Sequence, residues 1–304
     1  MIPIQVGEVL SPGVLLAVLG AALLAVQSLT VRYGTVTSRS ADALLVVLAV
    51  NVVVLVPLTL VLERPLRTLT LRSFAAFAAA GLVGTMAARA FYYESIKRIG
   101  SSRAEPIKAS QPLHATLVAV LVIGETVGPR HLLAMVCIVV GVALISYEHG
   151  RSNDGESEGG YAALALPLAA AFLFGIEPTF AKLGFAEGTS ILSGLLVKTV
   201  SAALAFALYL AWKRGLPRPS DFRRTELPWM VGAGLANTSF LLVYYGALTL
   251  EPVSVVVPLV QASPLLVILL SMLFVSDDLE RVTWRLAAGA SVVVVGAIGV
   301  TLAS

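Results

Sequence analysis

Ten apolar stretches, each about long enough to cross a bilayer, constrain this chain more than any other feature of its sequence. They cover residues 13–32, 42–62, 73–94, 103–123, 130–147, 161–182, 190–212, 227–249, 253–275 and 283–302. None of them shows the alternation of apolar and polar residues that a membrane β-strand requires. The sequence therefore predicts an all-α integral membrane protein with about ten transmembrane helices.

The composition supports a membrane location. Hydrophobic residues make up 58% of the chain and charged residues only 13%, whereas about 25% of a soluble domain is charged. So few polar side chains could not cover a surface in water, but lipid accepts an apolar surface. The net charge is only +3, and no basic run favours a nucleic-acid partner. We expect a multi-pass protein of the cell membrane, in contact with the lipid bilayer.

A polar segment at residues 148–160 contains no large apolar residue and divides the chain almost in the middle. Five expected spans lie on each side of it. We predict a first five-helix repeat at residues 1–147, a flexible polar linker at 148–160 and a second five-helix repeat at 161–304.

The two halves also repeat in sequence. An offset of 152 residues aligns Tyr92-Tyr93 with Tyr244-Tyr245, Pro106 with Pro258, and Pro112 with Pro264, and an offset of 150 aligns Gln27 with Glu177. An odd number of spans per half makes the second half enter the membrane from the opposite side. The sequence thus predicts two inverted repeats, an arrangement of secondary transporters that bind substrate near midplane between the halves.

A family resemblance rests on the stretch from Phe91 to Gly141. It is carried by Tyr92-Tyr93, Ser102-Arg103-Ala104, Pro112, Ile123-Gly124-Glu125 and Gly141-Val142, and more weakly in the second half by Tyr244-Tyr245, Pro264 and Gly296. This pattern resembles an EamA-like permease of the drug/metabolite transporter superfamily. Ser276-Asp277 departs from it, since the family usually has Gly-Glu there. The resemblance implies ten helices, two inverted five-helix repeats and metabolite transport.

Charged residues inside apolar spans are costly and are candidate site residues by default. Glu105 and Lys108 share a helix face, where they can form an ion pair or contact the substrate. Their counterparts in the second half are Val257 and Val260, so the fold at this place does not need the charges. Both readings stay open at this point.

Two further buried charges have competing interpretations. Arg89 can bind a substrate carboxylate or phosphate, or it can pair with Glu94 or Glu105. Glu177 can carry a proton, because desolvation disfavours its charged form, or it can neutralise Lys182 or Lys198. Lys198 lies near the middle of its span and needs a partner or a cavity.

Tyrosines and prolines complete the candidate site. Tyr92, Tyr244 and Tyr245 either line a cavity or belong to the aromatic belt at the membrane surface, and Gln27 is the uncharged counterpart of Glu177. Prolines break helical hydrogen bonds, so we expect helix bends at Pro106, Pro112, Pro178, Pro258 and Pro264.

These features predict a secondary transporter that moves a small polar metabolite, such as an amino acid or an organic anion, by alternating access. A proton gradient or substrate exchange would supply the energy, since the sequence has no Gly-x-x-x-x-Gly-Lys-[Ser/Thr] nucleotide motif. No common catalytic motif occurs, and Cys137 is the single cysteine, so we expect no enzymatic activity, cofactor or metal. The alternative is a lipid-handling flippase or a non-transporting membrane protein.

The orientation of the chain is left open by two conflicting indications. With the termini inside, five Lys and Arg residues would lie in the inner loops and thirteen in the outer loops, so the positive-inside rule favours termini outside. The family resemblance implies termini inside. The sequence does not indicate an oligomeric state.

Overall fold

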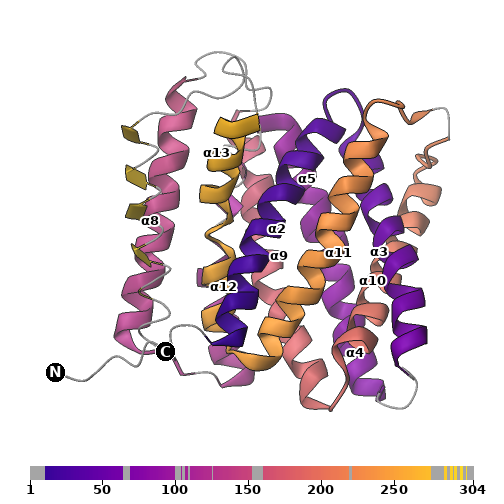
Figure 1. Ribbon diagram of the computed structural model, residues 1–304, viewed down its shortest axis with the longest axis horizontal. Coiled ribbons are helices and arrows are strands. Elements are labelled where there is room, and N and C mark those ends of the chain that lie inside the picture. Colours follow the sequence, from indigo (N-terminus) through magenta and orange to yellow (C-terminus); the bar gives the residue numbers. More distant parts are fainter. Residues whose placement is uncertain are drawn as a thin grey trace.

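The computed structural model describes residues 11–63, 69–99, 104, 107–108, 110–124, 126–152, 160–218 and 221–274, with short pieces between 284 and 299. These parts form a bundle of helices without a strand (Figure 1). The helices are α2 (Pro12–Gly34), α3 (Ser40–Leu62), α4 (Leu71–Ala80), η2 (Gly81–Ala88), α5 (Arg89–Ile99), α7 (Gln111–Val118), η3 (Ala119–Ile123), α8 (Pro129–Ser152), α9 (Gly160–Ala186), α10 (Ile191–Trp212), α11 (Leu227–Leu250), α12 (Val253–Val260) and α13 (Ser263–Phe274).

Six helical segments are long and apolar enough to cross a bilayer. They are Pro12–Gly34, Ser40–Leu62, Leu71–Ile96, Ala165–Ala186, Ile191–Trp212 and Leu227–Leu250. The all-helical, multi-pass prediction is therefore confirmed. Of the other four expected spans, 103–123 and 253–275 correspond to shorter or interrupted helices. The span 130–147 lies within α8, whose apolar stretch Pro129–Gly141 is shorter than the other spans, and most of 283–302 lies outside the described residues. The total of ten stays a prediction.

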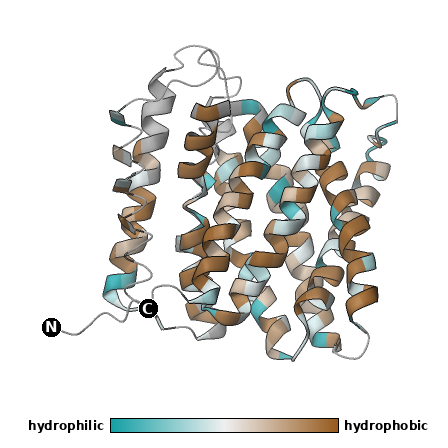
Figure 2. Ribbon diagram, viewed as in Figure 1, coloured by the Kyte–Doolittle hydropathy of each residue, from teal (hydrophilic) through white to brown (hydrophobic). Residues whose placement is uncertain are grey.

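Large apolar side chains cover the outside of the bundle. Val61, Leu121 and Leu208 are among those more than two-thirds exposed, and apolar residues run along the middle of the helices (Figure 2). Such a surface would be unfavourable in water, and it suits contact with lipid acyl chains.

The two halves are packed into one another. In the first half, α2 packs against α11, α12 and α13 of the second half, and α2 and α11 lie side by side (Figure 1). In the second half, α9 packs against α4, η2, α5 and α7 of the first. The opening helix of each half thus lies among helices of the other half, as expected for related halves.

Carboxylates fasten the halves together at both ends of the bundle. At one end, Glu226 accepts hydrogen bonds from the backbone N–H and the hydroxyl group of both Thr37 and Ser38, at 2.5–3.1 Å. At the other end, Glu63 accepts hydrogen bonds from the hydroxyl groups of Ser190 and Ser193. We call these two groups the Glu226 clasp and the Glu63 clasp.

The clasps are related by the sequence repeat. Thr37-Ser38 aligns with Thr189-Ser190 at the offset of 152 residues. Ser38 precedes α3 and Ser190 is the N-cap of α10, the second helix of each half. Each half therefore offers the same short loop to a carboxylate of the other half.

The prolines act differently from the predicted bends. Pro112 and Pro264 are the second residues of α7 and α13, where a missing N–H costs no helical hydrogen bond, so they begin helices and do not bend continuous ones. Between α12 and α13 the chain makes a turn at Gln261-Ala262. Pro178 and Pro258 lie inside α9 and α12, and Pro106 lies outside the described residues.

The predicted linker also begins later than expected. Helix α8 continues to Ser152, so residues 148–152 are helical and do not form a flexible segment. Residues 153–159 lie outside the described part of the chain.

Candidate functional site

A small cavity lies in the middle of the bundle, between helices of both halves. It leaves about 50 Å³ for the centres of water-sized molecules, enough for a few waters or one small group. It is lined by Leu24, Gln27, Gly84, Thr85, Arg89, Tyr92, Lys108, Gln111, Phe174, Glu177, Lys198, Phe240, Leu241, Tyr244, Val260 and Gln261. We call this space the central cavity.

Two tyrosine pairs flank the central cavity in a related way. Gln27 donates a hydrogen bond from Nε2 to the Tyr93 hydroxyl oxygen at 2.9 Å, and the Tyr245 hydroxyl donates to Glu177 Oε1 at 2.6 Å. Gln27 and Glu177 are counterparts in the repeat, and so are Tyr93 and Tyr245. The repeat thus extends from sequence to individual side-chain contacts, with an amide in one half and a carboxylate in the other.

The tyrosines are cavity or core residues and not part of a surface belt. Tyr92, Tyr93, Tyr244 and Tyr245 are all at most 4% exposed. Tyr92 and Tyr244 line the central cavity, whereas Tyr245 lies behind it and positions Glu177. Burial places these residues inside the protein, and a substrate contact of Tyr92, Tyr244 or Tyr245 stays a prediction.

Glu177 and Lys198 form a buried ion pair. Lys198 Nζ lies 2.6 Å from Glu177 Oε1 and 4.4 Å from the centre of the Tyr245 ring, and neither charged side chain is more than 7% exposed. Of the partners considered from the sequence, Glu177 therefore contacts Lys198. Lys182 instead donates to the backbone oxygen of Glu251 at 2.8 Å.

Arg89 is a buried cation in a different situation. Its side chain is 5% exposed, its Nε is fully buried without a hydrogen bond, and its guanidinium group forms no ion pair within the described part of the chain. Of the two partners considered from the sequence, Glu94 contacts Arg98 at 2.7 Å and Ser40 at 2.7 Å. The other partner considered, Glu105, lies outside the described residues.

Lys108 is almost fully buried, at 2% exposed, and its Nζ lies 4.7 Å from the centre of the Tyr92 ring. A cation at this distance from a ring face is attracted by the ring quadrupole. Lys108 and Lys198 therefore each lie over a tyrosine of the repeated pair. Glu105, the ion-pair partner expected for Lys108, lies outside the described residues.

Sequence reasoning missed several polar residues of the cavity. Thr85 and Gln261 each have a buried side-chain oxygen without a hydrogen-bond partner, and the same is true of the Tyr244 hydroxyl. The Gln111 and Gln261 amides contact each other across the halves. Uncharged polar residues are common in membrane helices, so no single-sequence signal singles these out, although Gln111 stands next to the repeated proline Pro112.

The wall that carries Arg89 has an unusual backbone. Residues Gly81–Ala88 form a π-helix, which ends immediately before Arg89. Wide helical turns of this kind are frequent at functional sites. Gly84 on this segment packs so closely on Glu177 that a Cβ atom there would lie 2.7 Å from the Glu177 Cβ atom.

Most of the predicted site residues come together in the central cavity. Gln27, Arg89, Tyr92, Lys108, Glu177, Lys198 and Tyr244 line it. Tyr245 lies in the next layer of side chains. Glu105 is not described, so its membership stays a prediction.

Comparison with known proteins adds to this picture. No curated protein matches the sequence significantly. A solved crystal structure of a protein matches the fold with a TM-score of 0.72 at 18% sequence identity, over 94% of this chain and 96% of that chain, and it supports the fold alone. The model of the EamA-like transporter family matches twice, at residues 11–147 and 161–302, so this chain belongs to the EamA-like transporter family.

Proposed function

We propose that this protein is a secondary transporter of a small organic anion, and that Arg89 binds the anionic group. The observation that carries the proposal is the buried Arg89 guanidinium group, whose Nε has no hydrogen-bond partner and which forms no ion pair among the described residues. A charge is costly to bury unless it is paired, and a carboxylate of the substrate would supply the missing partner. A guanidinium group also fits a carboxylate through two parallel hydrogen bonds.

The charges around the central cavity favour an anion over a cation. Among the described lining residues, Arg89, Lys108 and Lys198 are positive and Glu177 is negative. Glu177 already contacts Lys198 and Tyr245, so it is not available to a substrate ammonium group without breaking that pair. A cavity with balanced charges would favour a zwitterion, whereas the excess of positive charge among these lining residues favours an anion.

The rest of the cavity suits a small amphipathic molecule. Phe174, Phe240 and Leu241 provide apolar surface, while the amides of Gln111 and Gln261 can hydrogen-bond to a polar substituent. A cavity of this size favours a compact metabolite over a phospholipid. The flippase alternative therefore receives no support from the central cavity.

The proposed mechanism is alternating access by two inverted repeats, at residues 1–147 and 161–304, joined by the segment 148–160. Substrate exchange or a proton would drive it, and Glu177 with Lys198 is the candidate coupling pair. A bound proton on Glu177 would release Lys198 from the ion pair, which would change the charge of the cavity in the course of one cycle.

The test is uptake by proteoliposomes that contain the purified protein. A panel of small carboxylates, amino acids and organic cations is offered, and the Arg89→Gln variant is compared with the native chain. Arg98→Gln is the matched control, because Arg98 lies on the same helix but is half-exposed and paired with Glu94. We expect Arg89→Gln to raise the KM for the carboxylate about thirtyfold. This factor corresponds to the loss of about 2 kcal/mol of binding free energy from the charged hydrogen bonds between Arg89 and the carboxylate.

Arg98→Gln should leave the KM near the native value. Uptake of cations but not carboxylates by the native protein would contradict the proposal. An unchanged KM in Arg89→Gln would remove Arg89 from the site.

A further inference from the structure

A second pocket lies at the end of the bundle that carries the Glu226 clasp. It is formed by the loop between α2 and α3 and by the connection between α10 and α11, and its volume is about 460 Å³. The charged residues of its lining are Arg39, Arg214, Arg218, Arg223, Asp42 and Asp221. We call it the arginine pocket.

The arginine pocket has more positive than negative charge. Asp42 is engaged by Arg39 through two hydrogen bonds, at 2.9 and 2.7 Å, and Asp221 accepts the backbone N–H of Arg218 at 2.8 Å. The guanidinium groups of Arg214, Arg218 and Arg223 form no hydrogen bond or ion pair with any residue in the described part of the chain. Among the described residues, the guanidinium groups of these three arginines therefore have no carboxylate within hydrogen-bonding distance, although Asp42 and Asp221 also line the pocket.

The walls of the arginine pocket are held in place before any ligand arrives. The Glu226 clasp fixes Thr37 and Ser38, and Arg39 bridges the two loops by donating to the backbone oxygen of Gly215 at 3.2 Å. Arg214 takes a left-handed backbone conformation with φ of 51°, which is uncommon for a residue with a side chain. A site that is organised in advance loses less entropy when it binds.

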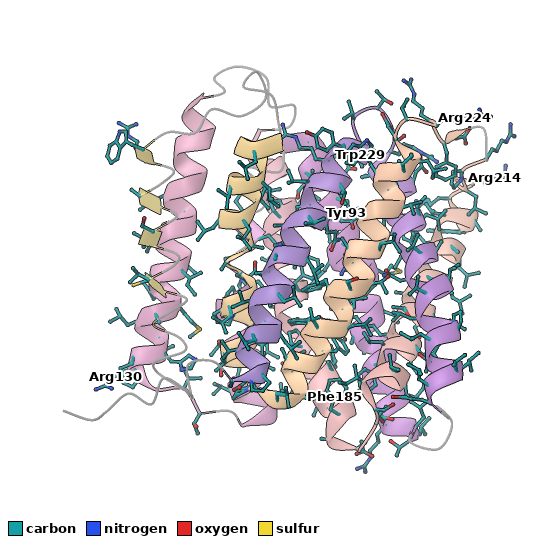
Figure 3. All side chains as sticks on the ribbon, in the orientation of Figure 1. Tyr93, Arg130, Phe185, Arg214, Arg224 and Trp229 are labelled. Atoms are coloured by element: carbon teal, nitrogen blue, oxygen red, sulfur yellow. The ribbon has the colours of Figure 1, made fainter. Side chains whose placement is uncertain are left out.

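The position of the pocket points to the level of the lipid headgroups. Trp212 at the end of α10 is 76% exposed and Trp229 at the start of α11 is 45% exposed, and these residues lie just before Arg214 and just after Arg223 in the sequence. Exposed tryptophans of membrane proteins gather at the interface between acyl chains and water. Figure 3 shows Arg214, Arg224 and Trp229 at the same end of the bundle.

We propose that the arginine pocket binds a phosphate group, presented by the headgroup of an anionic phospholipid at this surface of the membrane. Guanidinium groups bind phosphate oxygens through paired hydrogen bonds. Three guanidinium groups around one pocket can therefore donate to both free oxygens of a phosphate diester. The tryptophans place the pocket where such phosphates lie. A soluble phosphate compound has the same chemistry, and the experiment separates the two sources.

The experiment measures the thermal stability of the detergent-purified full chain with added short-chain phosphatidylglycerol, phosphatidylcholine or glycerol 3-phosphate. The apparent Kd comes from the concentration dependence of the stabilisation. The test variants are Arg218→Gln and the triple variant Arg214→Gln, Arg218→Gln and Arg223→Gln. The control combines Arg72→Gln with Arg130→Gln, two exposed arginines outside the pocket.

We expect phosphatidylglycerol to stabilise the native protein and phosphatidylcholine to do so much less. The apparent Kd should rise about fivefold in Arg218→Gln and on the order of a hundredfold in the triple variant. These factors correspond to a loss of about 1 kcal/mol of binding free energy for each arginine removed near an anionic surface. The control should keep the native Kd. Because the single variant removes only an exposed side chain, it still tests the site if the triple variant does not fold.

Glycerol 3-phosphate separates the two sources. Stabilisation by phosphatidylglycerol alone supports the lipid as the ligand, and equal stabilisation by glycerol 3-phosphate overturns the lipid source in favour of a soluble phosphate. A lack of response to both compounds, or an equal loss of response in the control variant, overturns the proposal. None of these outcomes depends on transport through the central cavity.

Discussion

Buried cations of the central cavity differ in what balances them. Lys198 contacts Glu177 at 2.6 Å, whereas Arg89 has no carboxylate within hydrogen-bonding distance in the described part of the chain. A paired charge contributes to the fold, and an unpaired one is available to a ligand. Two residues that the sequence presents as similar candidates therefore have different surroundings in the described part of the structure.

The ion pair predicts that Glu177→Gln destabilises the protein. Removal of one partner leaves a buried ammonium group without its anion, which costs about 3–5 kcal/mol. The double change Glu177→Gln with Lys198→Gln removes both charges and should recover most of that loss. Thermal unfolding of the three proteins in the same detergent measures the difference.

The same variants address proton coupling. If Glu177→Gln is as stable as the native protein and still accumulates substrate along a pH gradient, both the ion-pair interpretation and the proton-carrier role are wrong. Loss of gradient-driven uptake in the stable double variant, with substrate exchange retained, would support the coupling role.

Glu226 predicts a dependence of stability on acid. Burial raises the pKa of its carboxyl group, but the hydrogen bonds from Ser38 and Thr37 outweigh burial and hold the pKa below the usual 4.5. A group with a lowered folded-state pKa stabilises the fold above its unfolded pKa, and this contribution disappears as the pH falls through the folded value. The Tm of the native protein should therefore fall below about pH 4.5 more steeply than that of Glu226→Gln. Parallel curves for the two proteins would contradict this role of the clasp.

The charged residues that line the central cavity could be predicted from sequence, but the choice among their possible partners could not. A charge inside an apolar span is conspicuous because it is costly, and this identified Arg89, Lys108, Glu177 and Lys198. Which of them pair depends on how the helices pack. Lys182 is nearer to Glu177 in the sequence, yet Glu177 pairs with Lys198, which lies 21 residues away on α10. The uncharged residues Thr85 and Gln261 gave no such signal, because a membrane helix tolerates them at little cost.

Among the helices, the π-helical segment Gly81–Ala88 forms part of the cavity wall. It joins α4 to α5 without a break in the span, and it places Gly84 against Glu177 and Thr85 in the cavity wall. The apolar run at 73–94 predicted a helix here but could not predict its wider turn. Local sequence decides whether a segment forms a helix or a strand. The hydrogen-bond pattern within that helix also depends on the side chains that pack against it.

Gly84→Ala tests this close approach. The added methyl group would press on the Cβ and Cγ atoms of Glu177, and overpacking of this kind costs about 1–3 kcal/mol. We expect a lower Tm and reduced uptake in proteoliposomes. Gly232→Ala is the matched control, since its Cβ would meet only the Thr30 Cγ2 atom at 3.8 Å, and it should behave like the native protein. Equal effects of the two changes would show that the contact at Gly84 is not special.

At the scale of the whole molecule, the repeat accounts for most of what the sequence predicted. The aligned tyrosines and prolines indicated two related halves, and the family model matches each half separately. The interlocking of the halves, with α2 among second-half helices and α9 among first-half helices, was not readable from the alignment. It depends on contacts between helices of different halves, which the structure shows.

Inverted repeats predict that the 63–72 and 213–226 loops reach opposite sides of the membrane. Single cysteines are introduced as Arg72→Cys and Arg224→Cys, both at exposed positions, after Cys137 is replaced by Ala. An impermeant maleimide added to sealed vesicles of uniform orientation should label one variant and not the other. Labelling of both from outside would end the two-half interpretation, whichever way the termini point.

The Glu226 clasp and the Glu63 clasp hold the two halves together at opposite ends of the bundle. When the halves separate at one end, the carboxylate of that clasp exchanges its protein hydrogen-bond donors for water. Separation at either end therefore costs little free energy compared with disturbing the apolar core. Within the described residues, the Glu226 clasp has four hydrogen bonds and the Glu63 clasp has two. At the Glu63 end, Ser11 also donates to Glu251 and Thr70 to Glu187, so carboxylate hydrogen bonds between the halves close the bundle at both ends.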